Sequence, residues 1–312
     1  MRISPECLPR GPRLPRDHWQ KEIAKLDPDI EYEEMSRIVA QHEFPWDLQQ
    51  ALSFALFRTY AVPSIGRLLF ETNEFTKNVQ RRHDDTVLIL DAIATDGMAS
   101  QDGRTAIRRM NKMHGSYEIS NDDMRYVLST FVVTPSRWIG LYGWRKGLPA
   151  EQLAAVRYYQ RLGRLMGIKD IPANFEEFSD LMDAYEAAHF AYDEGARAVA
   201  DSTLSLLASF YPVFPASIAR AFSLSLMEPH LLEAFGYKRP AAPVVFLSRG
   251  ALKLRARIVH FLPPRREPKR ARDIREVKSY PDGYRVDDLG TFPTGCPVTQ
   301  AGGMQARADT GA

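Results

Sequence analysis

Residues 75–93 read FTKNVQRRHDDTVLILDAI, and this stretch decides the class of fold. Its apolar side chains and one threonine recur at intervals of four, seven, four and three residues: Phe75, Val79, Thr86, Leu90 and Ile93. Because an α-helix makes one turn in about 3.6 residues, these intervals place all five side chains on one face of a helix. We therefore predict an amphipathic helix that is followed by the turn Asp96-Gly97.

The rest of the chain repeats this helical pattern. Residues 104–117 are predicted to form a second helix with one face made of Ile107, Met110, His114 and Tyr117. A third helix should begin after the capping residues 120–123 and be kinked or divided at Pro135. Further helices are predicted at 149–166, 175–192, 196–210, 215–235 and 243–261. No segment alternates as a strand does, so the sequence predicts an all-α fold.

The 312 residues are enough to form one large domain with a core that can hold a cofactor. We expect a single helical domain over residues 17–262, because no Gly/Ser-rich or Pro-rich linker interrupts residues 45–245. The ends, residues 1–16 and 263–312, are rich in Pro, Gly and charge, which predicts flexible segments. We expect the last 50 residues to be dispensable for cofactor binding.

Charge and cysteine usage limit the class of protein. The net charge is only +2, but residues 246–275 hold ten Lys or Arg and two acids. That region suits either contact with an anionic membrane or a solvated helix followed by a basic tail. The only cysteines, Cys7 and Cys296, exclude a disulfide framework and a Cys-rich zinc site.

Location and partners follow from what the sequence lacks. No apolar run approaches the roughly 18–20 residues of a spanning helix, and the N-terminal residues lack the apolar region of a secretory signal. We expect a cytoplasmic protein that is soluble or peripheral to a membrane. The basic residues gather at one end without a recognition motif, which argues against nucleic acid as a partner.

Two sets of polar residues on helix faces are candidates for chemistry. His114 shares an apolar face, where an imidazole can either ligate a metal or donate a hydrogen bond to a core carbonyl. Arg82 and Thr86 are four residues apart and point the same way. An inward arginine needs an anion or a developing negative charge, and the alternative is an ion pair with Asp84 or Asp85.

Several blocks of sequence resemble one family in their order and spacing. The resemblance extends over roughly residues 60–240, and its blocks are RRHDDT (81–86), AIRRMNKMHGSY (106–117), SNDDMRYVLSTFVVTPSRWIGLYGWR (120–145), MGIKDIP (166–172) and YEAAHFAYDEGA (185–196). Together they resemble the oxygenases typified by the mycophenolic acid biosynthesis B protein, which are related to the latex-clearing rubber oxygenases. The resemblance implies an all-helical domain around haem b.

The resemblance also assigns roles to individual residues. His114 corresponds to the proximal iron ligand, and Arg82 and Thr86 correspond to polar residues of the distal helix. Asp85 stands where the rubber oxygenases have a lysine that can be the sixth ligand, and a carboxylate does not reproduce a neutral amine. Asp85 is instead expected to pair with Arg82 or to move a proton. Glu71 and Asp85 are the candidates for an allylic proton acceptor.

The activity implied is cleavage of a carbon–carbon double bond by dioxygen, in an apolar isoprenoid or prenylated substrate. Haem would perform the difficult chemistry, and the protein would supply position and electrostatics. In this account Arg82 stabilises the negative charge that develops as dioxygen reacts, and Thr86 donates a hydrogen bond or orients a water.

Two alternatives remain open at this point. Glu186 and His189 have the Glu-x-x-His spacing of di-iron helical bundles, although no second copy occurs in the chain. That spacing is the basis for a non-haem di-iron oxidase. The other alternative is a membrane-associated or lipid-binding helical protein without enzyme activity. In that case His114 would belong to the core, Arg82 would pair with Asp85, and the basic helix 243–262 would be the functional part.

Overall fold

The computed structural model describes residues 14–290, and within this range it contains fourteen α-helices and no β-strand. The prediction of an all-α fold is therefore confirmed. The helices are α1 (His18–Ile23), α2 (Tyr32–Ile38), α3 (Pro45–Tyr60), α4 (Pro63–Glu71), α5 (Glu74–Lys77), α6 (Val79–Asp96), α7 (Gln101–His114), α8 (Asn121–Tyr142), α9 (Pro149–Leu165), α10 (Phe175–His189), α11 (Glu194–Ser209), α12 (Ala216–Leu226), α13 (Pro229–Ala234) and α14 (Ala242–Phe261). A π-helical turn (Val39–Glu43) and two 3₁₀ turns (Ala271–Asp273 and Val286–Asp288) complete the elements.

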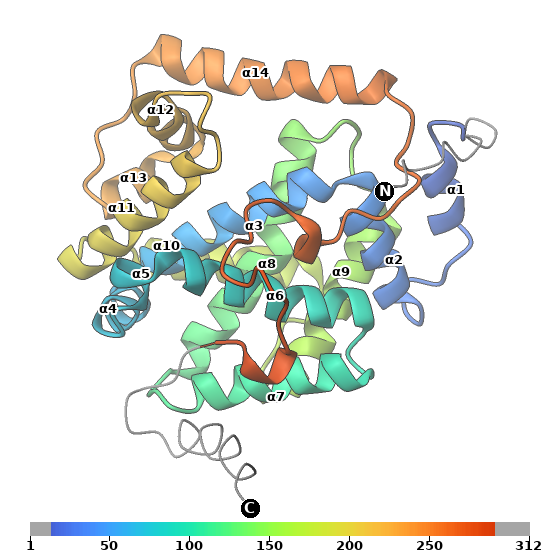
Figure 1. Cartoon of the computed structure of the whole chain (residues 1–312), viewed down its shortest axis with the longest axis horizontal. Helices are drawn as coiled ribbons and strands as arrows, with labels where there is room; N and C mark the ends of the chain where they lie inside the picture. Colours follow the sequence, from blue (N-terminus) through green and yellow to red (C-terminus); the bar gives the residue numbers. More distant parts are fainter. Residues whose placement is uncertain (1–13, 291–312) are drawn as a thin grey trace, which may run out of the picture.

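Helices α3 and α8 pack against each other at the centre of the molecule (Figure 1). Helices α9 and α10 pack on α8, α6 packs on α7, and α11 packs on α4. The long helix α14 runs along the opposite edge of the molecule from α7 and packs on α12 (Figure 1). Apolar residues between these layers form separate buried clusters rather than one continuous core, and this leaves room for a cavity among α3, α6, α7 and α8.

Side-chain caps determine where helices α7 and α8 begin. The Ser100 hydroxyl accepts a hydrogen bond from the Gly103 amide at 2.8 Å at the start of α7. The Ser120 hydroxyl does the same for Asp123 at 3.0 Å at the start of α8. These side chains satisfy amides that have no partner within a helix. The start of α8 agrees with the prediction, whereas α7 begins three residues earlier than expected because Ser100 is its cap.

Three predicted helices differ from the structure in their continuity. The first is two helices, because Asn78 leaves helical geometry with φ −129° and ψ 34° between α5 and α6. The segment 215–235 is also two helices, with Pro229 in the first turn of α13. Pro135 does not divide α8, and the proline is buried where α8 packs on α3. Tertiary packing therefore outweighs the local preference of this proline.

Residues 263–290, here called the C-terminal strap, are mostly irregular, as predicted, but several of them bind to α6 and α7. Leu289 is fully buried in the apolar cluster of α6 and α7. Asp84 on α6 accepts hydrogen bonds from the Lys278 amide, the Ser279 amide and the Ser279 hydroxyl at 2.7–2.9 Å. The expectation of a loose tail is therefore wrong for these residues. Residues 1–13 and 291–312, including Cys7 and Cys296, lie outside the described part.

Candidate active site

A cavity of about 960 Å³ lies among α3, α6, α7, α8 and α9. This volume is at the upper end of the roughly 300–1,000 Å³ that is usual for small-molecule sites. Its walls are mainly apolar and include Leu52, Leu56, Val127, Phe131, Leu162 and Leu207. Such a cavity favours an apolar ligand, and the few polar groups on its wall become the candidates for chemistry.

His114 lies at the C-terminal end of α7 and lines the cavity. Its Nδ1 atom is buried and has no hydrogen-bond partner among residues 14–290. Burial, and next the positive charge of Arg82, lower the pKa of His114 to about 4. The ring is therefore neutral near pH 7, which is the form that binds metals. The carbonyl partner expected of an ordinary core histidine does not occur in the described structure.

Arg82 and Thr86 project together from α6 toward the same cavity. Arg82 Nη1 donates a hydrogen bond to Thr86 Oγ1, and Thr86 Oγ1 donates one to the Arg82 carbonyl at 2.9 Å. The guanidinium carbon lies 5.2 Å from the centre of the Phe75 ring, which suits a cation–π contact. Arg82 forms no ion pair with any residue between 14 and 290. The cavity therefore holds a cation that no described carboxylate neutralises.

The two neighbouring aspartates turn to the strap instead of to Arg82. Asp84 is bound by residues of the strap, and Asp85 accepts a hydrogen bond from the Tyr280 hydroxyl. Asp85 is completely buried, its Oδ2 atom has no partner in the described part of the chain, and it does not line the cavity. The expected pairing of Asp85 with Arg82 does not occur, because both carboxylates are engaged on another side of α6.

Glu71 is not brought to the cavity either. It lies exposed at the C-terminal end of α4, beside a shallow pocket that it shares with Arg67 and Glu118. His83, in contrast, does line the cavity, but its Nδ1 atom lies 3.0 Å from Asp84 Oδ1. The structure thus brings His114, Arg82 and Thr86 together and leaves Asp85 and Glu71 apart from them.

Residues 48–256 match the family described as ER-bound oxygenase mpaB/B'/rubber oxygenase, catalytic domain. The chain belongs to this family. The matched range extends from within α3 to within α14 and contains Arg82, Thr86 and His114.

Individual members of the mpaB/rubber oxygenase family align with most of the chain. The ER-bound oxygenase mpaB' of Penicillium brevicompactum is 27% identical over 274 residues, which are 82% of this chain and 65% of that protein. ER-bound oxygenase mpaB of Penicillium roqueforti is 27% identical over 236 residues, 70% of this chain and 79% of the relative. For mpaB of Penicillium brevicompactum the identity is 29% over 227 residues, 66% of this chain and 58% of the relative. The chain thus spans less than two thirds of the first and the third of these.

Three observations test whether this mpaB/rubber oxygenase domain suits a haem. The buried His114 nitrogen without a partner is the donor that an iron ligand requires. The cavity is apolar and large enough for a bulky cofactor. Arg82 and Thr86 supply the polar groups on the wall that includes α6. The residues present therefore fit a haem ligated through His114.

Tyr60 is a cavity residue that the sequence did not single out. It is fully buried on α3, and Thr203 of α11 also lines the cavity. Burial raises the pKa of Tyr60, while nearby Arg82 acts in the opposite direction. The stretch FALFRTY (54–60) predicts an apolar helix face, so no local signal distinguished this tyrosine from its neighbours.

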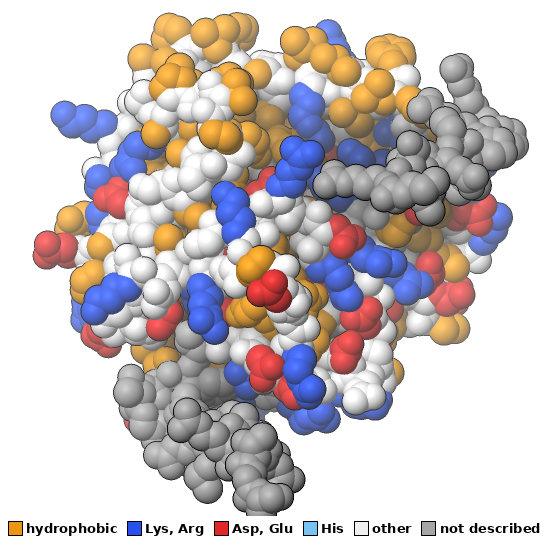
Figure 2. Space-filling view, viewed as in Figure 1, with side chains coloured by type: hydrophobic (Ala, Val, Ile, Leu, Met, Phe, Trp, Pro, Cys, Tyr) orange, Lys and Arg blue, Asp and Glu red, His pale blue; other side chains and the backbone are white. Residues whose placement is uncertain are grey.

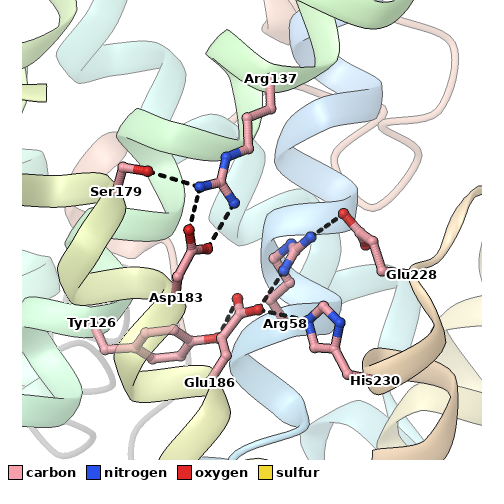
Figure 3. A network of polar contacts seen from close by, with 8 residues as sticks. All are labelled: Arg58, Tyr126, Arg137, Ser179, Asp183, Glu186, Glu228 and His230. Carbon is pink, nitrogen blue, oxygen red and sulfur yellow. Dashed lines mark hydrogen bonds and ion pairs between the residues drawn. The ribbon is translucent and has the colours of Figure 1, made fainter. Parts of the chain in front are cut away.

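Glu186 and His189, which have the Glu-x-x-His spacing, do not come together as ligands of one metal site. Glu186 is buried and accepts hydrogen bonds from Arg58 at 2.6 Å and from Tyr126 at 3.3 Å, and His230 Nε2 lies 2.9 Å from it (Figure 3). His189 is exposed, and its ring stacks on Tyr185 at 4.0 Å. The lone pairs of Glu186 are therefore occupied by a cation and two further donors, which does not favour the di-iron alternative. His230 of α13 belongs to this network.

Proposed function

We propose that this chain is a haem b-dependent oxygenase that cleaves a carbon–carbon double bond of an apolar, isoprenoid-like substrate with dioxygen. The observation that carries this proposal is the neutral, unpartnered His114 in an apolar cavity that also holds the cation of Arg82. Membership of an oxygenase family supports the reaction class. In the overall reaction both oxygen atoms enter the product, one in each of the two carbonyl groups that replace the double bond.

The residues of the cavity have separate roles in this proposal. His114 would hold the haem through a ring nitrogen, and the bound haem would supply the activation of dioxygen. Arg82 is a fixed cation that would stabilise negative charge developing beside it, because an apolar, dry surrounding strengthens the attraction. Thr86 holds the guanidinium in place through its hydroxyl. Apolar walls would bind the substrate chain and exclude water.

Asp85 and Glu71 have weaker claims to a place in the chemistry. Asp85 is proposed to act through position, because its bond to Tyr280 fixes one side of the helix that carries Arg82 and Thr86. The cavity wall carries further protonatable groups, among them the ring of His83 and the hydroxyl of Tyr60. The charge of Arg82 acts on Tyr60, and we propose the Tyr60 hydroxyl for contact with a polar end of the substrate.

The absorption spectrum of the purified full chain, produced with haem available, tests the proposal. A Soret band that shifts on reduction is expected, and His114→Ala should remove most of the bound haem. His189→Ala is the matched control, because that imidazole is exposed and outside the cavity. Arg82→Ala should retain haem but lower turnover of prenylated substrates by about 10²–10³-fold. Full haem retention in His114→Ala would remove this residue as the ligand.

We also propose that the protein works at a membrane surface. The three relatives are named ER-bound, and an isoprenoid-like substrate would partition into lipid. Between residues 14 and 290, no helix combines the length and the apolar character needed to cross a bilayer. Contact through an interfacial surface is the mode that this combination favours.

A further inference from the structure

Exposed apolar side chains gather on one edge of the molecule, formed by α12, the loop before it, and α14. Figure 2 shows these hydrophobic side chains along the edge that Figure 1 assigns to the two helices. The most exposed are Val213, Phe214, Ile218, Phe246, Leu247, Leu254, Ile258 and Phe261. We call this set the α12–α14 face. A contiguous exposed apolar surface of this kind generally marks an interaction site.

The α14 helix is held by its other side, so the α12–α14 face is a fixed feature of the fold. Ser248, Leu252 and Ala256 are buried toward α12 and α8. Arg255 reaches inward to the buried carboxylate of Asp47 at 2.9 Å. Leu247, Leu254, Ile258 and Phe261 follow one another at intervals of seven, four and three residues and consequently lie together on the outward side.

The charge beside this face has one sign. Residues 235–266 contain eight Lys or Arg and no Asp or Glu. Arg255 is paired inward, whereas Lys253 and Arg257 are exposed and form no ion pair within the described residues. Exposed Phe214, Phe246 and Phe261 add aromatic rings at the same edge. An apolar stripe bordered by cations complements a bilayer surface, in which acyl chains lie beneath anionic headgroups.

We propose that the α12–α14 face is the surface by which this protein inserts shallowly into anionic membranes. Leu254, Ile258 and Phe261 would enter the boundary between headgroups and acyl chains, while Lys253 and Arg257 would remain at the lipid phosphates. This inference rests on the proposed location at a membrane and specifies the surface and the lipid class. The contact region extends from α12 to α14 and is therefore wider and more apolar than the basic segment 246–275 predicted from the sequence.

Vesicle flotation of the full chain tests the proposal. The probes are phosphatidylcholine vesicles with and without phosphatidylserine. The chain should float with the anionic vesicles, and the double variant Leu254→Glu/Phe261→Glu should lower binding by about tenfold or more. Ile30→Glu is the matched control, because Ile30 is 75% exposed in the α1–α2 connection, away from this face. Lys253→Ala/Arg257→Ala should weaken only the binding to anionic vesicles.

The outcomes distinguish failure of the proposed membrane location from failure of the α12–α14 face as the contact surface. A chain that floats with neither vesicle refutes the membrane location itself. If the double variant floats as well as the unaltered chain, the location holds and the α12–α14 face is not the contact. Sedimentation velocity without lipid tests whether a second copy of the chain occupies this face instead. If the unaltered chain is a dimer and the double variant is a monomer, the face is a contact between two copies and the proposal is overturned. Neither measurement needs haem or substrate.

Discussion

Arg58 and Arg82 both point into the protein, but their charges meet different partners. Arg58 is buried and meets the carboxylates of Glu186 and Glu228, so its charge is compensated within the described structure. Arg82 also faces inward, but it meets only a hydroxyl and an aromatic ring. A charge in low dielectric is costly unless something opposes it, which is why the uncompensated arginine is the functional candidate and the compensated one is structural.

Loss of Arg58 should be far more damaging than loss of an exposed arginine from the same network (Figure 3). Arg58→Met would leave the buried Glu186 carboxylate without its guanidinium partner and should lower the free energy of unfolding by about 3–5 kcal/mol. Arg137→Met removes the more exposed pair with Asp183 and should cost less than about 1 kcal/mol. Urea denaturation measures both. Equal losses would show that Glu186 does not depend on Arg58.

At the scale of single elements, α6 carries out two tasks at once. One side presents Arg82 and Thr86 to the cavity, and another presents Asp84, Asp85 and Asp91 to the strap. The aspartates hold the helix from outside, so the guanidinium is positioned without a carboxylate beside it. The bond from Tyr280 to Asp85 belongs to this second task.

Asp84 should stabilise the fold in a pH-dependent manner. Burial alone would raise its pKa, but hydrogen bonds from His83, Ser279 and the backbone at Lys278 outweigh burial and lower the pKa. The carboxylate therefore stabilises the folded state above the unfolded pKa of about 3.9, and this contribution is lost as the pH falls through the lowered folded value.

We accordingly expect Asp84→Asn to lower the free energy of unfolding at pH 7 by about 1.5–3 kcal/mol. The difference from the unaltered chain should shrink below about pH 4. Denaturant titrations at both pH values measure it, with the exposed strap residue in Asp282→Asn as the control. A pH-independent difference would mean that the charge of the Asp84 carboxylate does not cause the loss of stability.

The periodicity of the sequence predicted the helices better than it predicted which side chains bond to one another across the fold. The helical face of His114 and the spacing of Arg82 and Thr86 are local properties, and the structure brings these three residues to one cavity. The bonds of Asp84 and Asp85 join residues about 195 positions apart, and no local pattern encodes such a pairing. For the same reason Tyr60 was not predicted, because it shares the cavity wall with residues that are remote in sequence, such as Thr203.

For the whole molecule, the strap makes the C-terminal region part of the catalytic domain. It covers α6 through Ser279 and Tyr280, and Leu289 fills the space between α6 and α7. Lys269, Arg270, Ala271 and Ile274 contribute to the cavity wall itself. The family match ends at residue 256, so these contributions come from outside the matched range.

Removal of the strap should therefore impair the site, contrary to the expectation from sequence. A chain that ends at residue 262 leaves Asp84 and Asp85 without their donors and opens the apolar cluster around Leu289. Its thermal midpoint should fall, and its haem uptake should drop. A chain that ends at residue 290 is the comparison, because the two differ only in the strap. Equal midpoints and equal Soret absorbance would show that the strap is dispensable.

The strap also has a consequence for biosynthesis. A ribosome releases α6 and α7 long before residues 278–289, which lie near the end of the described chain. During that interval Asp84 and Asp85 lack the donors of Lys278, Ser279 and Tyr280. The site is therefore completed only when the strap has been made. Stalled nascent chains that end before residue 278 should show fast amide hydrogen exchange along α6, and longer chains should show protection. Assembly of the site would thus be a late event, timed by translation.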